Sequence, residues 1–220
     1  MVHARMGSAR LPGKVLGDLA GRPALDWLLE RLAHAATLDV VVVATSEEPV
    51  DDAIAAHCTA RDVPCHRGSL DDVAARVLGA AEAHGLDVLV RVNGDSPVLD
   101  QRLVDEGVEL LLQTGADLVT NVRPRSFPPG QSVEVLRTAA LRAATAGPEE
   151  EPGDREHVTP WLYRHPEAVR IERFAHDPPV TAPTLTLDTP EDHAQLESIL
   201  RDLDRPHWEL HWDEVVARAC

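Results

Sequence analysis

The first fourteen residues contain a segment whose residue types could bind a phosphate group. From Arg5 to Lys14 the chain reads RMGSARLPGK, which combines two glycines and a serine with three cations. Backbone N–H groups of a glycine-containing turn can point at phosphate oxygens, and Arg10 and Lys14 could neutralise charge on a leaving pyrophosphate. Charge and glycine content alone also fit a flexible, solvent-exposed tail. A local phosphate site is therefore one of two interpretations.

Two aspartates in strand-end positions could hold a divalent metal ion. Asp95 follows the apolar run that ends at Val92, and Asp188 ends the sequence TLTLD. Carboxylates together with substrate phosphates are common ligands of Mg²⁺. Helix capping is the alternative: Asp100 is better placed than Asp95 for this role, whereas Asp188 stands at an ordinary helix start before Thr-Pro-Glu. With an anion-binding loop, such carboxylates are the parts that phosphoryl or nucleotidyl transfer needs.

Other kinds of catalytic or metal site lack their sequence signatures. No serine stands in a GxSxG setting, the eleven histidines form no HExxH pair, and no GxGxxG motif is present. The three cysteines, Cys58, Cys65 and Cys220, form no CxxC pair and have no histidines at zinc-ligand spacing. We therefore expect reduced thiols, and phosphoryl or nucleotidyl transfer is the chemistry that remains.

The composition limits the partners and the compartment. The 220 residues carry a formal net charge of −16, with 37 acidic and 21 basic residues, and Lys14 is the only lysine. Broad nucleic-acid binding depends on clustered Lys and Arg, so this charge argues against it. No run approaches the ~18 apolar residues of a membrane span, and the N-terminus lacks the apolar stretch of a signal peptide. We expect a soluble cytoplasmic protein that binds neither nucleic acid nor membrane.

Strands and helices alternate from the start of the chain to residue 121. The patterns predict helices over 23–36, 49–60, 70–84 and 100–113, and strands over 39–45, 63–66, 87–92 and 117–121. This order predicts an α/β fold with a mostly parallel central sheet, helices on both faces and ligands at the carboxyl ends of the strands. Only Met1–Ala4 precedes the cationic loop, so we expect either a truncated first strand or a true start that lies upstream.

After residue 121 the pattern loosens. Residues 122–182 are expected to form a β-rich insertion that covers the crevice or makes a dimer contact, within a single domain whose core is 1–121 and 183–220. We expect strands over 132–136, 168–174 and 184–187, helices over 138–145, 155–164 and 190–202, a turn-rich loop over 123–130 and an exposed acidic loop over 146–154. The strand over 184–187 would return to the sheet and carry Asp188 to its edge.

Six segments in order resemble the cytidylyltransferases of the spore-coat polysaccharide type, relatives of the CMP-Kdo and CMP-N-acylneuraminate synthetases. They are RMGSARLPGK (5–14), VVVATSEE (41–48), RGSLDDVAAR (67–76), NGDSPVLD (93–100), DREHVTP (154–160) and LDTPED (187–192). The resemblance spans essentially the whole chain and implies a Rossmann-like nucleotidyltransferase fold of the GT-A-like kind. It also implies an Mg²⁺-dependent homodimeric enzyme that transfers CMP from CTP to an acceptor oxygen and releases pyrophosphate.

The resemblance further implies roles for individual residues. Arg10 and Lys14 would hold the triphosphate and, with Asp95, form the catalytic set. Asp95 and Asp188 would ligate Mg²⁺. The implied nucleotide-binding set is Ala4, Arg5, Met6, Gly7, Ser8, Arg10, Lys14, Arg67, Ser69 and Asn93. Within it, Arg67 and Ser69 would lie near the base or ribose.

The acceptor is expected to bind to the segment 122–182. The acceptor-binding set is Arg123, Arg125, Glu134, Arg155 and His157. Its arginines could hold an anionic group through two hydrogen bonds, and ordinary surface arginines are the alternative. At 130–134 this chain reads GQSVE where relatives usually read GLDVE, so an acidic side chain is replaced and the acceptor could differ from the usual sugar. A 3-deoxy-2-ulosonic acid, another acidic sugar, a sugar phosphate and a phosphonate all remain open.

Two other functions fit parts of the sequence. A metal-dependent glycosyltransferase that uses a nucleotide-sugar predicts an Asp-X-Asp pair after a strand, whereas Asp95 is followed by Ser-Pro. A non-catalytic nucleotide-binding protein fits the short N-terminus and the altered GQSVE segment. The cytidylyltransferase ranks first because it accounts for the cationic loop and for both aspartates.

Overall fold

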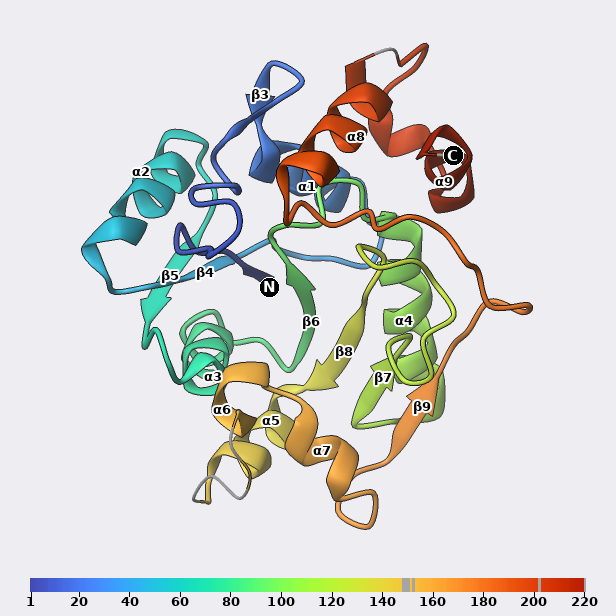
Figure 1. Ribbon diagram of the computed structural model, residues 1–220. Coiled ribbons are helices and arrows are strands. Elements are labelled where there is room, and N and C mark those ends of the chain that lie inside the picture. The colour runs from blue at the N-terminus through green and yellow to red at the C-terminus, as the bar shows by residue number, and fades with distance from the viewer. Residues whose placement is uncertain (148–150, 152, 202, 220) are drawn as a thin grey trace.

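A seven-stranded sheet runs through the middle of the protein in the computed structural model, which describes residues 1–147, 151, 153–201 and 203–219 (Figure 1). The strand order is β5-β4-β1-β6-β8-β7-β9, and neighbouring strands are parallel except where β8 pairs with β6 and β7. The strands are β1 (Val2–His3), β4 (Val43–Ser46), β5 (Cys65–Gly68), β6 (Val88–Asn93), β7 (Leu118–Thr120), β8 (Glu134–Arg137) and β9 (Ile171–Arg173). A separate antiparallel pair joins β2 (Asp18–Leu19) to β3 (Arg22–Pro23). The predicted mostly parallel sheet is confirmed.

Helices cover both faces of this sheet, as predicted. They are α1 (Ala24–Ala33), α2 (Asp52–Ala60), α3 (Val73–Ala83), α4 (Gln101–Thr114), α5 (Thr138–Thr145), α6 (Asp154–His157), α7 (Pro160–Arg164), α8 (Pro190–Arg201) and α9 (Trp212–Ala219), with short 3₁₀ turns at Pro49–Asp51 and His207–Glu209. Successive strand residues point to opposite faces. Accordingly, Val90 packs in one core cluster with apolar residues of α1 and α4, whereas Leu89 packs in another with α3 and α5.

Local signals place the helices that border the strand ends. The Asp72 side chain accepts a hydrogen bond from the Ala75 N–H at 2.8 Å and caps α3, and Asp100 caps α4 by accepting from the Arg102 N–H at 3.0 Å. Asp100 is thus the helix cap that the sequence predicts. The neighbouring Asp95 is left for another role.

Residues 122–182 add two strands and several helices to the central sheet. They supply β8, which lies between β6 and β7, and β9, which pairs with β7, together with α5, α6 and α7. The single helix predicted over 155–164 is wrong, because α6 ends at His157 and α7 begins at Pro160. A proline lacks the N–H that a continuing helix would use, and Val158 between the two helices has a positive φ of 70°. The division into core and insertion stays a prediction, and residues 148–150 and 152 of the expected loop lie outside the described residues.

The strand predicted over 184–187 is also wrong. This segment is extended chain whose partners are loops: the Leu185 N–H donates to the Pro129 carbonyl and the Leu187 N–H donates to the Asp95 carbonyl, both at 2.8 Å. Leu185 and Leu187 are buried against Leu196 of α8. The alternation of threonine and leucine at 184–187 therefore reflects packing of the two leucines on a helix and not pairing with a strand.

Arg31 ties α1 to two distant parts of the chain. Its fully buried guanidinium donates to the carbonyls of Leu99 at 2.6 Å, Leu210 at 2.7 Å and His207. Burial lowers the pKa of Arg31 to about 10, so the group remains charged at neutral pH. The loop after β6 and the C-terminal segment are thus fixed to the same helix.

Among the described residues, no helix is long and apolar enough to cross a membrane. Cys58 and Cys65 are free thiols, as expected. Cys220 lies outside the described residues.

Candidate active site

A cavity of about 410 Å³ lies where the carboxyl ends of β1 and β6 meet the N-terminal loop. The predicted position of the ligand crevice matches this cavity. Its lining combines the loop at 4–10 and Lys14 with Asp95, Asp188 and several residues of β6, α3 and α6. His3 and Asp188, 185 positions apart in the sequence, therefore line the same cavity.

Lys14 joins the two aspartates at one end of the cavity. Its ammonium donates to Asp95 Oδ2 and to Asp188 Oδ1, each at 2.7 Å, and the Arg10 guanidinium lies 3.2 Å from Asp188 Oδ2. Partial burial pulls the pKa of Asp188 upward, but the hydrogen bond and charge of Lys14, with help from Arg10, hold this pKa below its usual value. Both cations that sequence reasoning assigned to the triphosphate thus lie beside the predicted metal carboxylates.

Backbone contacts explain why Asp95 and Asp188 meet. The hydrogen bond from Leu187 to the Asp95 carbonyl sets the two segments side by side, and the Gly94 N–H donates to the His3 carbonyl at 2.7 Å. A Cβ on Gly94 would lie 2.7 Å from that same oxygen, so only glycine fits this approach. Helix capping does not use Asp188, because Thr189 and Asp192 exchange capping bonds at the start of α8.

The cationic loop is fixed by hydrogen bonds, which excludes the interpretation as a flexible tail. The Met6 N–H donates to Asp51 Oδ1 at 2.6 Å, and the Gly13 N–H donates back to the Met6 carbonyl at 2.9 Å. Gly13 has a φ of 74°, a backbone conformation that favours glycine. Sequence reasoning missed Asp51, whose only sign was its place three residues after the resembling segment 41–48.

The two carboxylates fit a hard divalent cation. Asp95 Oδ1 is buried and has no hydrogen-bond partner in the described part of the chain, so a strong acceptor is left unsatisfied beside Asp188. No group of three or more metal-ligating side chains occurs among the described residues. Two carboxylates, with phosphate and water oxygens completing the shell, suit Mg²⁺ better than zinc.

The part of the cavity around His3, called its other end below, contains four side chains that sequence reasoning missed and one, His157, that it predicted. His3 of β1, Arg76 of α3 and Arg91 of β6 line this end, together with Glu156 and His157 of α6. Burial lowers the pKa of His3 well below its usual value, and the charges of Arg91 and Arg76 add to the effect. The sequence signals were an arginine in the middle of the apolar strand DVLVRVN and, for Arg76, its place at the end of the resembling segment 67–76.

Most of the predicted acceptor residues lie elsewhere. Arg125 donates to Ser132, Arg123 lies over the Tyr163 ring, and Arg155 donates to the carbonyls of Thr145 and Gly147. These three arginines do not line the cavity, and their direct contact with the acceptor stays a prediction. Of the predicted set, His157 lines the cavity, and the buried Glu134 reaches it through an ion pair with Arg91 at 2.6 Å.

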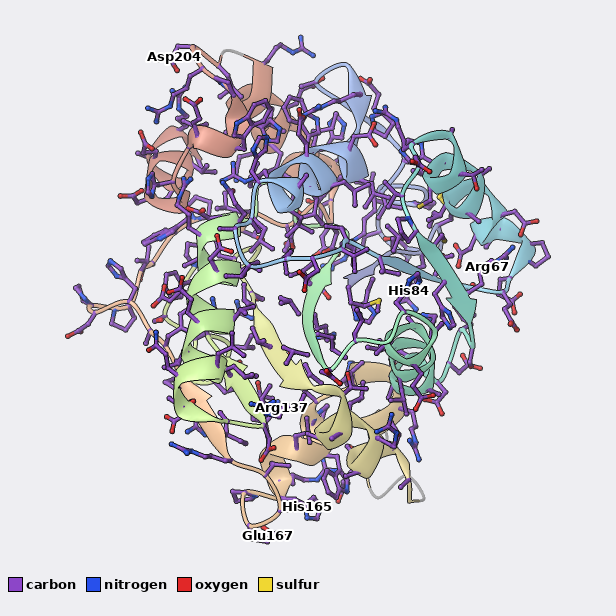
Figure 2. All side chains as sticks on the ribbon, turned by 180° about the vertical axis from the view of Figure 1, so that it is seen from behind. Arg67, His84, Arg137, His165, Glu167 and Asp204 are labelled. Atoms are coloured by element: carbon purple, nitrogen blue, oxygen red, sulfur yellow. The ribbon has the colours of Figure 1, made fainter. Side chains whose placement is uncertain are left out.

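Some of the predicted nucleotide-binding residues line the cavity and others do not. Those that line the cavity are Ala4, Arg5, Gly7, Ser8, Arg10, Lys14 and Asn93. Met6 instead acts through its backbone, as described above. Arg67 pairs with Asp52 at 2.6 Å on the edge strand β5 (Figure 2), and the Ser69 hydroxyl accepts from the Asp72 N–H at 2.9 Å. Neither Arg67 nor Ser69 lines the cavity, so the proximity to base or ribose stays a prediction.

Comparison with known proteins gives one consistent family. A family model described as cytidylyltransferase matches residues 1–203. The chain is 32% identical to the spore coat polysaccharide biosynthesis protein SpsF of Bacillus subtilis over 205 residues, which cover 90% of this chain and 84% of SpsF. It is 31% identical to the 3-deoxy-manno-octulosonate cytidylyltransferase of Paramagnetospirillum magneticum over 219 residues, with 90% and 83% covered.

A solved structure agrees with the sequence relatives. The structure of a cytidylyltransferase from Leptospira borgpetersenii superposes with a TM-score of 0.89 at 31% identity, covering 98% of this chain and 90% of the other. The likeness therefore extends over both the sheet and the segment 122–182. Because the family model and these relatives span nearly the whole chain, the protein belongs to the cytidylyltransferase family and is a nucleotidyltransferase.

Proposed function

We propose that the protein transfers CMP from CTP to an anionic acceptor in an Mg²⁺-dependent reaction and releases pyrophosphate. The observation that carries the proposal is the contact of Lys14 with both Asp95 and Asp188 beside the cationic loop. Family membership supports CTP as the nucleotide. A glycosyltransferase that uses a nucleotide-sugar is not favoured, because the matching family is that of the cytidylyltransferases.

Asp95 and Asp188 would hold Mg²⁺, which when bound neutralises charge on the phosphates and on the leaving pyrophosphate. Arg10, Lys14 and the N–H groups of the loop bind the triphosphate. An acceptor oxygen then forms a bond to the α-phosphorus while the bond to the pyrophosphate breaks. The chain's contribution is positioning and charge stabilisation, so no covalent nucleophile is needed.

The acceptor is an acidic sugar, a sugar phosphate or a phosphonate. SpsF is named for polysaccharide biosynthesis and the other relative for 3-deoxy-manno-octulosonate, which favours a sugar acid as the first candidate. Pairing of two copies and a place in the cytoplasm are part of the same proposal, and the family resemblance supports them. Analytical ultracentrifugation tests the pairing: a single species at the mass of one chain would contradict it.

A pyrophosphate-release assay tests the activity. The four nucleoside triphosphates are each combined with 3-deoxy-manno-octulosonate, N-acetylneuraminate, glucose 1-phosphate and a phosphonate, with Mg²⁺ or with EDTA. We expect release with CTP, Mg²⁺ and at least one acceptor, and no release with EDTA. Equal rates with all four triphosphates, or full activity in EDTA, would refute the proposal.

A further inference from the structure

The part of the cavity around His3 contains two guanidinium groups that come from different elements. Arg91 projects from β6 and Arg76 from α3, and both side chains line the cavity. The strand β1 lies between β4 and β6, and its last residue, His3, lines the same space. The cationic loop already supplies Arg10 and Lys14 for a triphosphate, so this second set of cations is available for another charge.

Arg91 is held by a buried hydrogen-bond network. Its Nη1 donates to Glu134 Oε2 at 2.6 Å, while Tyr163 Oη and Thr159 Oγ1 donate to Glu134 Oε1 at 2.6 and 2.9 Å. Glu134 is only 3% exposed. Burial and the neighbouring carboxylate raise the pKa of Tyr163, so its hydroxyl remains a donor. The network anchors one nitrogen of Arg91, whereas its buried Nε has no partner in the described part of the chain.

Arg76 is anchored in a similar way. It is 5% exposed, and its Nη1 donates to the carbonyls of Ser69 and Leu70. Its Nε is also buried without a hydrogen-bond partner among the described residues. A guanidinium fixed at one nitrogen and unsatisfied at another can bind a carboxylate or phosphate with little loss of side-chain freedom.

His3 completes this end as a neutral hydrogen-bonding group. Both of its ring nitrogens are buried, and within the described residues neither has a partner. A neutral imidazole offers one donor and one acceptor. Its low pKa makes it a weak base, so hydrogen bonding to a substrate suits it better than proton abstraction.

We infer that Arg91 and Arg76 bind the negatively charged group of the acceptor, and that His3 hydrogen-bonds to the same molecule. The inference rests on the proposed function, because it assigns the second substrate of that reaction to this end of the cavity. The shared chemistry is a carboxylate or phosphate group. Glu134 and Tyr163 are positioning residues, since they act through Arg91.

Binding and kinetics of single variants test the inference. The probes are 3-deoxy-manno-octulosonate for a carboxylate and glucose 1-phosphate for a phosphate, measured by calorimetry, with CTP measured separately. We expect the protein to bind one of these probes, and Arg91→Lys and Arg76→Lys to weaken that binding by about 10- to 100-fold while CTP affinity stays within about twofold. Lysine keeps the charge beside Glu134 but removes the planar fork. Arg142→Lys, at an exposed arginine on α5 paired with Glu82, is the matched control.

His3 offers a second test with a matched pair of variants. His3→Gln keeps neutral hydrogen-bonding groups and should retain most of the probe affinity, whereas His3→Leu should lose it by several-fold. A shape requirement alone would affect both variants equally. Thermal unfolding curves show whether each variant folds, and the lysine and glutamine variants keep the test valid if His3→Leu does not.

Several results would overturn the inference. They are wild-type protein that binds neither probe, lysine variants that bind the probe as the wild type does, and lysine variants that lose CTP affinity instead. The last result would place the arginines in the nucleotide half. Failure of the proposed function looks different, because wild-type protein would then release no pyrophosphate even when a probe binds through Arg91.

Discussion

At one end of the cavity Lys14 donates to two carboxylates, while at the other end Arg76 and Arg91 each keep a buried Nε without a partner in the described part of the chain. The first end is neutralised within the protein, so the proposed binding of a metal and a triphosphate there would require an exchange of ionic partners. The second end has positive groups already fixed by buried neighbours. If the proposed function holds, we expect the end with Lys14 to rearrange its contacts on binding, whereas the other end is preorganised.

The largest expected effect is a loss of activity at the end of the cavity where Lys14 contacts Asp95 and Asp188. Asp95→Asn removes one charge from the proposed metal site and should reduce the rate of pyrophosphate release by about 10³-fold or more. Asp204→Asn is the control, because Asp204 (Figure 2) is an exposed carboxylate that pairs with Arg218 and does not line the cavity. A rate of Asp95→Asn within tenfold of the control would contradict the assignment of Asp95.

Replacing Lys14 tests whether this residue exchanges its carboxylate partners for the triphosphate. Lys14→Met should lower kcat/KM for CTP by about 100-fold, because it removes a charge-assisted contact to the triphosphate. It should also raise the pKa of Asp188, since the hydrogen bond and charge of Lys14 now lower that pKa. Carboxyl chemical shifts followed against pH measure the second effect. An unchanged titration of Asp188 would mean that the Lys14 contact is weak in solution.

The preorganised end predicts a smaller and more selective effect. Glu134→Gln removes the charge that holds Arg91 and should raise KM for the acceptor by about tenfold, with KM for CTP unchanged. Glu82→Gln, at an exposed partner of Arg142, is the control. Equal increases in both KM values would show that Glu134 supports the whole fold and has no selective role at this end.

The smallest expected effect is on stability, because His3 and Asp188 lose their contributions to the unfolding free energy in different pH ranges. The pKa of His3 is lowered in the folded protein, so its stability contribution is complete above pH ~6.5 and is lost as the pH falls toward the folded pKa. Asp188 also has a lowered pKa, and its contribution begins to fall only below pH ~4. Between pH 7 and 5, His3→Gln should therefore lose less unfolding free energy than wild type, as measured by urea denaturation. Equal losses of unfolding free energy between pH 7 and 5 in the variant and in the wild type would contradict this expectation.

The two ends also differ in how far sequence could predict them. The cationic loop and Asp95 lie in short contiguous motifs, so the chemistry that they can perform is indicated by residues adjacent in the sequence. Arg91, Arg76 and His3 stand in a strand, a helix and a two-residue strand, and they meet only through the sheet order. The local signals were a charged residue inside an apolar run for Arg91 and a place in the resembling segment 67–76 for Arg76, and neither says which partner the charge will meet.

The errors in the predicted elements have a similar cause. The apolar alternation at 184–187 reports burial and cannot tell a neighbouring strand from a helix such as α8. The order of strands and helices up to residue 121, in contrast, follows from repeated local patterns and was confirmed. The acceptor arginines were assigned to 122–182 by resemblance and loop position, and neither reveals that Arg155 turns toward the carbonyls of Thr145 and Gly147.

The hydrogen bond from Leu187 to the Asp95 carbonyl has a consequence for the order of folding. It joins residues 92 positions apart, and contacts of such sequence separation form slowly because a long loop must close first. During synthesis, the loop, Lys14 and Asp95 can associate while Asp188 is still inside the ribosome. The cavity therefore gains its second carboxylate only when the last quarter of the chain has docked, so catalytic competence is expected to be a late event in the maturation of this enzyme.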